Sequence, residues 1–338
     1  ERLSKAKHQS RSQRVDKKGG TAPDVSNVYV FDVPPASDIE AVVHEFQADP
    51  HVEYAQPDYI METNMVPNDP FYSSYGSWGQ TYDDLWGLKK IQAGQAWDTT
   101  QGEGVVVAVV DTGLDYNHPD IASNVWTNLG EIPNNGIDDD GNGKVDDVRG
   151  WDFANNDNDP MDGHGHGTHV SGTIAAVGNN GIGIIGVAPK AKIMPVKGLS
   201  DAGSGYTSAL ANGIVYAAQN GADVINNSWG CRGGCPSNPI AENAVRTAYS
   251  LGAVVVFAAG NDSADVANYS PQNMTDSKPV VVSATTQSDT PAYFTNFGPC
   301  VSVFLPGYLN KHIYGTSYSV PIATGLGSVI LNRNPGFD

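Results

Sequence analysis

The chain has 338 residues, which is enough for one large domain or two moderate ones. Hydrophobic residues make up 40% of it, so a sizeable core is expected, and 37 acidic against 19 basic residues give a net charge of −18. That charge argues against a nucleic-acid partner, which would require a basic face, and no stretch reaches the roughly 18 apolar residues of a membrane span.

The start of the chain forms a unit of its own. Residues 28–33 and 52–55 have the composition of strands, and residues 39–47 place apolar side chains on one helix face. A small α+β unit, ordered from about residue 28 and ending near residue 64, is therefore predicted. A polar stretch with two prolines, residues 62–70, separates it from the rest.

From residue 65 onward, unbroken apolar runs alternate with helical patterns. Such runs are typical of strands that are buried on both faces of a parallel sheet. We expect these strands at residues 105–110, 182–187, 193–196, 224–226, 254–258 and 280–283. Helical patterns lie between several of them, at residues 206–220 and 239–251. The alternation predicts a three-layer α/β domain over residues 65–338 with a mainly parallel central sheet, and function at the carboxyl ends of its strands.

Two polar residues are placed where acid–base chemistry would need them. Asp111 directly follows the strand expected at 105–110, so its carboxylate would be held at the rim of the sheet; a turn or helix cap is the alternative. His166 lies in GHGHGTHVSGTIAA at the expected start of a helix, where its orientation would be fixed, as a general base requires. Because His164 and His169 are close by, a metal site is the alternative, although no HExxH motif occurs.

A serine and an asparagine complete this set of polar residues. Ser317 lies in GTSYSVP at the expected start of a helix, so its hydroxyl would be exposed beside backbone N–H groups that could hold an oxyanion. Asn261 follows the strand in VVVFAAGND, and its amide could donate to the same oxyanion. Asn261 also begins an N-x-S sequon, so glycosylation is the alternative. Asp, His and Ser occur in the order of one known catalytic triad.

Together these motifs resemble those of subtilisin-like serine proteases, in particular the thermitase-like branch. The resemblance is carried by VAVVDTG, HGTHVSGTIAA and GTSYSVP, and it extends from about residue 67 to residue 317. It implies a subtilisin-like fold and a secreted, monomeric serine endopeptidase that cleaves proteins and peptides through an acyl-enzyme. Asp111 would orient His166, and His166 would take the proton of Ser317. Asn261 and the Ser317 N–H would hold the oxyanion.

The resemblance also assigns two segments to substrate binding. Both would pair with the backbone of an extended peptide, which gives broad sequence tolerance. One edge of the substrate cleft would comprise Gly203, Ser204 and Gly205. The other edge, beside the P1 pocket, would comprise Ser228, Trp229 and Gly230. Ordinary turn chemistry is the alternative for the glycines.

Acidic residues predict up to three calcium sites. Alternate oxygen ligands in a Gly-containing loop suit a hard cation, and a solvated acidic loop is the alternative. The first set comprises Asp138, Asp140, Asn142, Asp147 and the carbonyl of Lys144. By resemblance, a second set comprises Asp152, Asp157, Asp159 and the carbonyl of Met161. Also by resemblance, a third set comprises Asp69, Asp120, Asn180 and the carbonyls of Val177, Ile182 and Ile184.

The N-terminal unit, particularly HVEYAQPDYI, resembles the later part of the family's inhibitory propeptide. The resemblance implies a zymogen in which residues 1–64 inhibit the catalytic domain, with residues 60–64 in the substrate groove. A permanent accessory domain is the alternative. Among the three cysteines, Cys231 and Cys235 in CRGGC are close enough for a short disulfide, with two free thiols as the alternative, and Cys300 has no obvious partner.

The surroundings of Ser317 depart from the family pattern. Tyr318, Ser319 and Ile322 replace the usual Met, Ala and His, and the chain ends at Asp338, where the family continues with another helix. The domain over residues 65–338 is therefore expected to be truncated at its C-terminus, and a catalytically impaired binding or structural protein with this fold is the second hypothesis. An esterase of the α/β-hydrolase class would need G-x-S-x-G around its serine, which Ser317 lacks.

Overall fold

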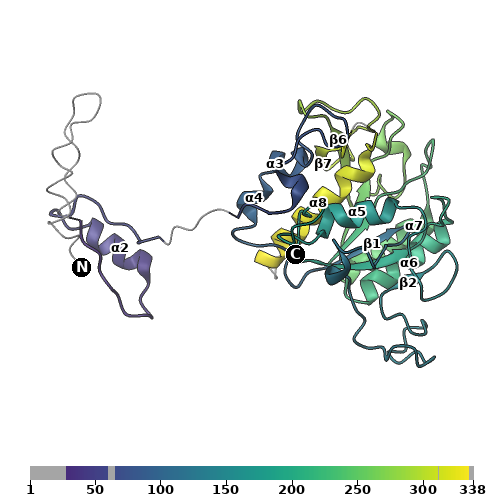
Figure 1. Ribbon diagram of the computed structural model, residues 1–338, viewed down its shortest axis with the longest axis horizontal. Helices are drawn as coiled ribbons and strands as arrows, with labels where there is room; N and C mark the ends of the chain where they lie inside the picture. Colours follow the sequence, from purple (N-terminus) through teal and green to yellow (C-terminus); the bar gives the residue numbers. More distant parts are fainter. Residues whose placement is uncertain (1–27, 60–64, 311, 335–338) are drawn as a thin grey trace. The chain divides into compact units, whose positions relative to one another are not determined.

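The computed structural model describes residues 28–59, 65–310 and 312–334, and the chain divides into two compact units between residues 63 and 64 (Figure 1). In the first unit, α2 (Ile39–Gln47) forms over the predicted range, and the Asp38 side chain caps it by accepting from the Ala41 N–H at 3.1 Å. Residues 60–64, expected in the substrate groove, lie outside the described residues.

The two strands expected beside α2 are not formed in the described residues of this unit. Tyr29 takes part in a single β-bridge, and residues 52–55 adopt no strand. A lone pair of strands is marginal in water without a buried face, and none of the described residues before residue 60 is buried. The helix needs no such partner for its backbone hydrogen bonds, so it alone matches the prediction.

The second unit contains a seven-stranded sheet in which every pair of neighbours is parallel. Its spatial order is β2-β3-β1-β4-β5-β6-β7. The strands are β1 (Val106–Asp111), β2 (Trp151–Asp152), β3 (Lys192–Lys197), β4 (Val224–Asn227), β5 (Val254–Ala258), β6 (Val280–Thr285) and β7 (Val303–Pro306). The mainly parallel sheet predicted from the apolar runs is thereby confirmed.

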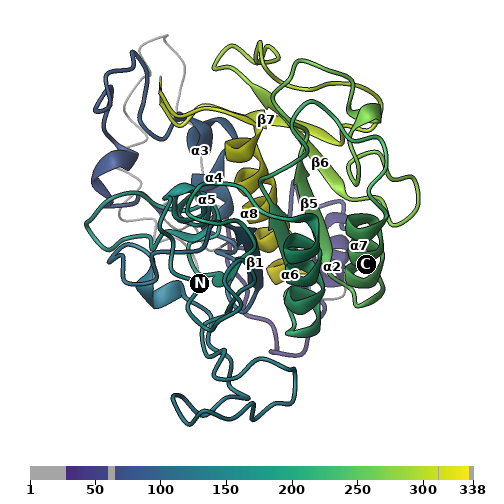
Figure 2. The same ribbon diagram turned by 90° about the vertical axis from the view of Figure 1, so that its right-hand side faces the viewer.

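Four helices cover the two faces of this sheet. The helices α5 (His166–Ala175) and α8 (Thr316–Arg333) lie side by side on one face, and α6 (Thr207–Gln219) and α7 (Pro239–Ser250) on the other (Figures 1 and 2). Side chains of β1 alternate between the two layers: Val107 and Val109 pack toward α5 and α8, whereas Ala108 and Val110 pack toward α6 and α7. The three-layer α/β architecture is confirmed. The shorter helices are η1 (Pro70–Tyr72), α3 (Trp86–Lys90), α4 (Ala93–Ala96), η2 (Ala122–Asn124) and η3 (Val266–Asn268).

The prediction of a strand at residues 182–187 is wrong, because this segment is a loop. Gly181 and Gly183 adopt positive φ angles of 75° and 55°, which a strand does not accommodate. A Cβ on Gly183 would lie 2.1 Å from Asp120 Oδ2, and the Ile184 N–H donates to the same oxygen at 2.9 Å. The segment therefore wraps around a carboxylate. The sequence did not indicate β2, which has two residues, or the edge strand β7.

The connections from β1 place the functional face of the sheet. Strand β1 has β3 on one side and β4 on the other, so the strand order reverses at β1, and ligands bind at the carboxyl ends of strands at such a point. A long loop between η2 and β2 extends from the domain (teal, bottom of Figure 2). None of the helices that the structure describes has the length and apolar character needed to cross a membrane.

Candidate active site

Asp111 and His166 are joined by a hydrogen bond. Asp111 is the last residue of β1 and is fully buried, and its Oδ1 accepts from His166 Nδ1 at 2.7 Å and from the Thr112 N–H at 2.7 Å. Because an ionised carboxylate only accepts, Nδ1 carries the imidazole proton, and Nε2 is left as an acceptor. The imidazole is thus in the tautomer that a general base needs.

The surroundings of His166 favour its protonated form. Burial is the largest single influence and lowers the pKa of His166, but the hydrogen bond and the negative charge of Asp111, together with the charge of Asp162, outweigh it. The pKa of His166 is therefore raised above its ordinary value. An imidazolium formed during a reaction would be stabilised at this position.

The Asp162 carboxylate connects the segment after Asp111 to the first turn of α5. It accepts from the Thr112 hydroxyl at 2.9 Å, from the Thr168 hydroxyl at 2.7 Å, and from the N–H groups of His164 and Gly165 at 2.9 and 2.8 Å. Burial raises the pKa of Asp162, but these hydrogen bonds together hold it below its usual range. Asp162 is not among the predicted site residues; its place immediately before GHGHG was the available signal.

Ser317 lies at the start of α8, beside the loop that follows β4. Its hydroxyl donates to the Ser228 carbonyl at 3.0 Å, and the Ser228 hydroxyl donates to the Ser317 carbonyl at 3.1 Å. The ring of the next residue, Tyr318, contacts the ring of His166, with 5.8 Å between centroids. The helix therefore brings Ser317 to the side of the sheet where His166 lies, with the serine hydroxyl turned toward Ser228.

Asn261 is oriented by the residue before Ser317. The Thr316 N–H and hydroxyl both donate to Asn261 Oδ1, at 2.9 and 3.0 Å. Since an N–H group can only donate, the amide orientation is fixed, and Nδ2 remains available as a donor. Asn261 and Ser317 line the same cavity, whose volume is about 390 Å³.

The segments assigned to substrate binding lie near these groups. Ser228, Trp229 and Gly230 line the cavity that contains Ser317, and the Trp229 ring stands edge-on to Phe257 at 5.1 Å. On the other segment, Gly203, Ser204 and Gly205 are all exposed. A Cβ on Gly203 would lie 2.9 Å from His164 Nε2, so this segment approaches the loop that leads to His166.

The predicted short disulfide is confirmed at one wall of the cavity. Cys231 and Cys235 are bonded, and Cys231 lines the cavity together with Ser228 and Ser317. Cys300 is a free, half-buried thiol. The disulfide therefore constrains the loop that follows β4.

Three carboxylates converge in the loop between η2 and β2. Ligand atoms of Glu131, Asp140 and Asp147 all lie within 4.8 Å of one another, which is the one such group among the described residues that could hold a metal ion. The Asn142 amide donates to both Asp140 and Asp147 at 3.0 Å. The Asp138 carboxylate instead accepts from N–H groups of its own loop, including that of Gly143 at 2.8 Å. Glu131 is not among the predicted ligands, because it precedes the repeated pattern of acids.

Of the other two acidic sets, one comes together. Asp69 and Asp120 are buried, and Asn180 joins them by donating from Nδ2 to Asp120 at 2.7 Å and from its N–H to Asp69 at 3.4 Å. Burial raises the pKa of Asp120, and the negative charge of Asp69 adds to that effect. The loop of Val177, Ile182 and Ile184 surrounds Asp120: the Val177 N–H donates to its carbonyl at 2.8 Å.

The remaining set does not converge in this structure. Asp152 accepts from the Ala154 and Asn155 N–H groups, at 2.7 and 2.8 Å. Asp157 accepts from the Asp159 N–H at 3.0 Å, while Asp159 accepts from the Tyr116 hydroxyl at 2.7 Å. Asp152 and Asp157 thus accept from turns of their own segment and Asp159 from a distant tyrosine, and the three are not among the described groups whose ligand atoms lie within 4.8 Å of one another.

Comparison with known proteins gives concordant results. Residues 102–338 match the model of the Subtilase family. A thermophilic serine proteinase from Bacillus sp. (strain AK1) is 37% identical, over 96% of this chain and 75% of that protein. Thermitase from Thermoactinomyces vulgaris is 40% identical, over 79% of this chain and 86% of that protein. A solved structure of proteases from Pseudoalteromonas arctica aligns with a TM-score of 0.64 at 34% identity, over 81% of this chain and 89% of that one.

Proposed function

This chain belongs to the subtilase family of serine endopeptidases, and from that membership we propose that Asp111, His166 and Ser317 are its catalytic triad. The observation that carries the proposal is the 2.7 Å hydrogen bond from His166 Nδ1 to the buried Asp111 carboxylate. It fixes the imidazole with Nε2 free to accept a proton. Ser317 supplies the hydroxyl. It lies at the start of α8, and the residue after it, Tyr318, contacts the His166 ring.

In the proposed reaction, the Ser317 hydroxyl turns from the Ser228 carbonyl toward His166 Nε2. His166 takes its proton while the serine oxygen attacks the carbonyl carbon of a peptide bond, and Asp111 stabilises the resulting imidazolium. His166 then gives the proton to the leaving amine. A water molecule then attacks the acyl-enzyme: His166 takes a proton from the water and returns it to the Ser317 oxygen as the acyl group leaves.

Asn261 serves as an oxyanion donor in this proposal. The former carbonyl oxygen, now negatively charged, would accept hydrogen bonds from Asn261 Nδ2 and from the Ser317 N–H. Thr316 supports this role because its N–H and hydroxyl donate to Oδ1 of the same amide, which leaves Nδ2 available as a donor. The segments Gly203–Gly205 and Ser228–Gly230 would hold the backbone of an extended peptide between them.

A fluorophosphonate probe that reacts with activated serines tests this function. We expect the folded, calcium-loaded protein without its N-terminal unit to be labelled and to cleave casein. Ser317→Ala should abolish labelling and lower kcat by about 10⁶. Ser288→Ala, an exposed serine outside the cavity, should behave as wild type. A folded wild-type protein that is not labelled would refute catalysis and favour the impaired binding protein.

We further propose that the enzyme binds calcium. Three carboxylates within 4.8 Å repel one another unless a cation is shared, and oxygen-rich sites of this kind suit calcium. Glu131, Asp140 and Asp147 would hold one ion, and Asp69, Asp120 and Asn180 would hold another. Both ions would be structural: the second would link the segment before η1 to the loop after α5.

We also propose that the enzyme is a secreted, monomeric zymogen. The similarity to the thermophilic serine proteinase covers 96% of this chain, so it includes most of the N-terminal unit, which would act as an inhibitory propeptide. The Cys231–Cys235 disulfide supports an oxidising compartment. Mass spectrometry of the activated protein tests processing, because an intact N-terminal unit in the active form would contradict it.

A further inference from the structure

Lys197 is a buried cation that the proposed reaction does not use. It is the last residue of β3, its side chain is 2% exposed, and it lies in register between Asp111 of β1 and Asp152 of β2. Its ammonium donates to the Thr112 carbonyl at 2.7 Å and to Asp201 Oδ1 at 2.6 Å. A buried ammonium without partners would be costly, so these two acceptors fix its position.

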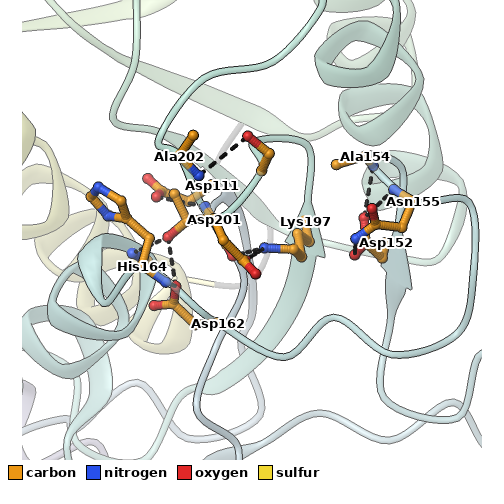
Figure 3. A network of polar contacts seen from close by, with 12 residues as sticks. Asp111, Asp152, Ala154, Asn155, Asp162, His164, Lys197, Asp201 and Ala202 are labelled. Carbon is orange, nitrogen blue, oxygen red and sulfur yellow. Dashed lines mark hydrogen bonds and ion pairs between the residues drawn. The ribbon is translucent and has the colours of Figure 1, made fainter.

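Asp201 is the charged partner of this ammonium. Figure 3 shows Lys197 pointing toward Asp201, on the side where Asp111, Asp162 and His164 lie, and away from Asp152. The Asp201 side chain is 64% exposed, and it touches the loop before α5: a Cβ on Gly163 would lie 2.4 Å from Asp201 Cγ. Lys197 chiefly, and the Gly163 backbone to a smaller extent, hold the pKa of Asp201 below its usual range.

The turn that contains Asp201 leads directly into the segment Gly203–Gly205. The Gly198 and Leu199 N–H groups both donate to the Asp111 carbonyl at 3.0 Å, which fixes the start of the turn. The turn is closed by the Ser200 N–H, which donates to the Ser204 carbonyl at 2.9 Å. Between these points, the Asp201 carboxylate provides the one ion pair described for the turn.

One carboxylate thus connects three parts of the site. Through Lys197 it is linked to Thr112, the neighbour of Asp111, and through Gly163 it contacts the loop that leads to His166. Its own backbone continues into the segment that would pair with the substrate. A displacement of this segment would weaken its pairing with the backbone of a bound peptide, which raises KM for substrates long enough to reach it.

We propose that Asp201, held by the buried ammonium of Lys197, is a positioning residue that sets the substrate-pairing segment Gly203–Gly205 in register with the Asp111–His166 pair. The proposal rests on the proposed endopeptidase function of the same site. Two classes of substrate should therefore respond differently to replacement of Asp201. Peptides long enough to pair with Gly203–Gly205 depend on Asp201, whereas small esters that reach only the cavity beside Ser317 do not.

Steady-state kinetics on one substrate of each class test this role. The substrates are a blocked tetrapeptide anilide and a blocked single-residue ester, and the variants are Asp201→Asn and Asp201→Ala. The matched control is Asp289→Asn, because Asp289 forms a 2.6 Å ion pair with Lys90 and is 61% exposed, away from the cavity. We expect Asp201→Ala to raise KM for the anilide roughly tenfold, with kcat and ester hydrolysis within about twofold of wild type.

Asp201→Asn should show a smaller rise in KM, because its amide oxygen still accepts from Lys197. Equal losses of activity on both substrates, together with a lowered melting temperature, would show that Asp201 has only a structural role and would overturn the inference. Wild-type kinetics for Asp201→Ala on both substrates would overturn it as well. If the wild type hydrolyses neither substrate, the proposed function is refuted and the inference falls with it; the two failures are therefore distinguishable.

Discussion

The backbone of Gly167 lies against the carbonyl group of Gly113, so closely that a Cβ on Gly167 would stand 2.1 Å from that oxygen. Gly113 follows Asp111 by two residues, and Gly167 directly follows His166. The Gly167 N–H also donates to the Thr112 hydroxyl at 2.9 Å. This close approach of two backbones brings the Asp111 carboxylate within hydrogen-bonding distance of the imidazole.

Gly167→Ala should therefore separate Asp111 from His166. A contact of 2.1 Å with a backbone oxygen cannot be relieved by a side-chain rotation, so α5 or the segment after β1 must move. We expect kcat/KM to fall by about 100-fold. Gly172→Ala, in the same helix, is the control, because its Cβ would meet only Ile184 Cδ1, at 3.7 Å. Equal activity of the two variants would contradict the prediction.

The acid limb of the pH profile should lie above the ordinary histidine value of 6.5, because Asp111 and Asp162 raise the pKa of His166. His166 must be neutral to accept the serine proton, so activity rises as pH increases through this raised pKa. Asp111→Asn removes the nearest negative charge and should move the limb to lower pH, with kcat lower by about 10⁴. A pH series of kcat/KM for both proteins measures the shift; a wild-type limb at or below pH 6.5 would speak against it.

Calcium should stabilise the protein in part through Glu131. An ion that binds only the folded state at 100 times its Kd adds about 2.7 kcal/mol to the free energy of unfolding, and EDTA should remove this gain. Glu131→Gln should shrink the difference between the melting temperatures in calcium and in EDTA. Glu103→Gln, which removes an exposed carboxylate paired with Lys190, should leave that difference unchanged. The same melting curve with and without EDTA would rule out calcium binding.

Removal of the Cys231–Cys235 disulfide should have a modest effect on stability and a clear effect on substrate binding. The bond closes a loop of about five residues, for which chain entropy accounts for about 2 kcal/mol of the free energy of unfolding. Because Cys231 lines the cavity with Ser317, KM should also rise in the double variant Cys231→Ser, Cys235→Ser. Cys300→Ser, at the free thiol, is the control. Guanidinium unfolding and steady-state kinetics report the two effects, and an unchanged KM would show that the loop holds its shape unaided.

Much of the fold and the three proposed catalytic residues could be predicted from local sequence. An apolar run such as residues 105–110 indicates a strand buried on both faces, and Asp111 at its end follows from the same run. The glycines around His166 and the Gly-Thr before Ser317 indicate helix starts. The run at residues 182–187 was misleading, because Asp120 accepts hydrogen bonds from this loop and Gly181 and Gly183 allow it to bend.

The sequence by itself thus determined most of the helices and strands of the larger unit, because their patterns lie in consecutive residues. Only the tertiary structure decided which distant groups meet: the bond between Asp111 and His166 joins positions 55 residues apart. The close contact of Gly113 with Gly167, the convergence of Glu131 with Asp147, and the link from Lys197 to Asp201 near Gly163 belong to this second kind. They depend on how strands and loops pack against one another, and no run of neighbouring residues encodes that packing.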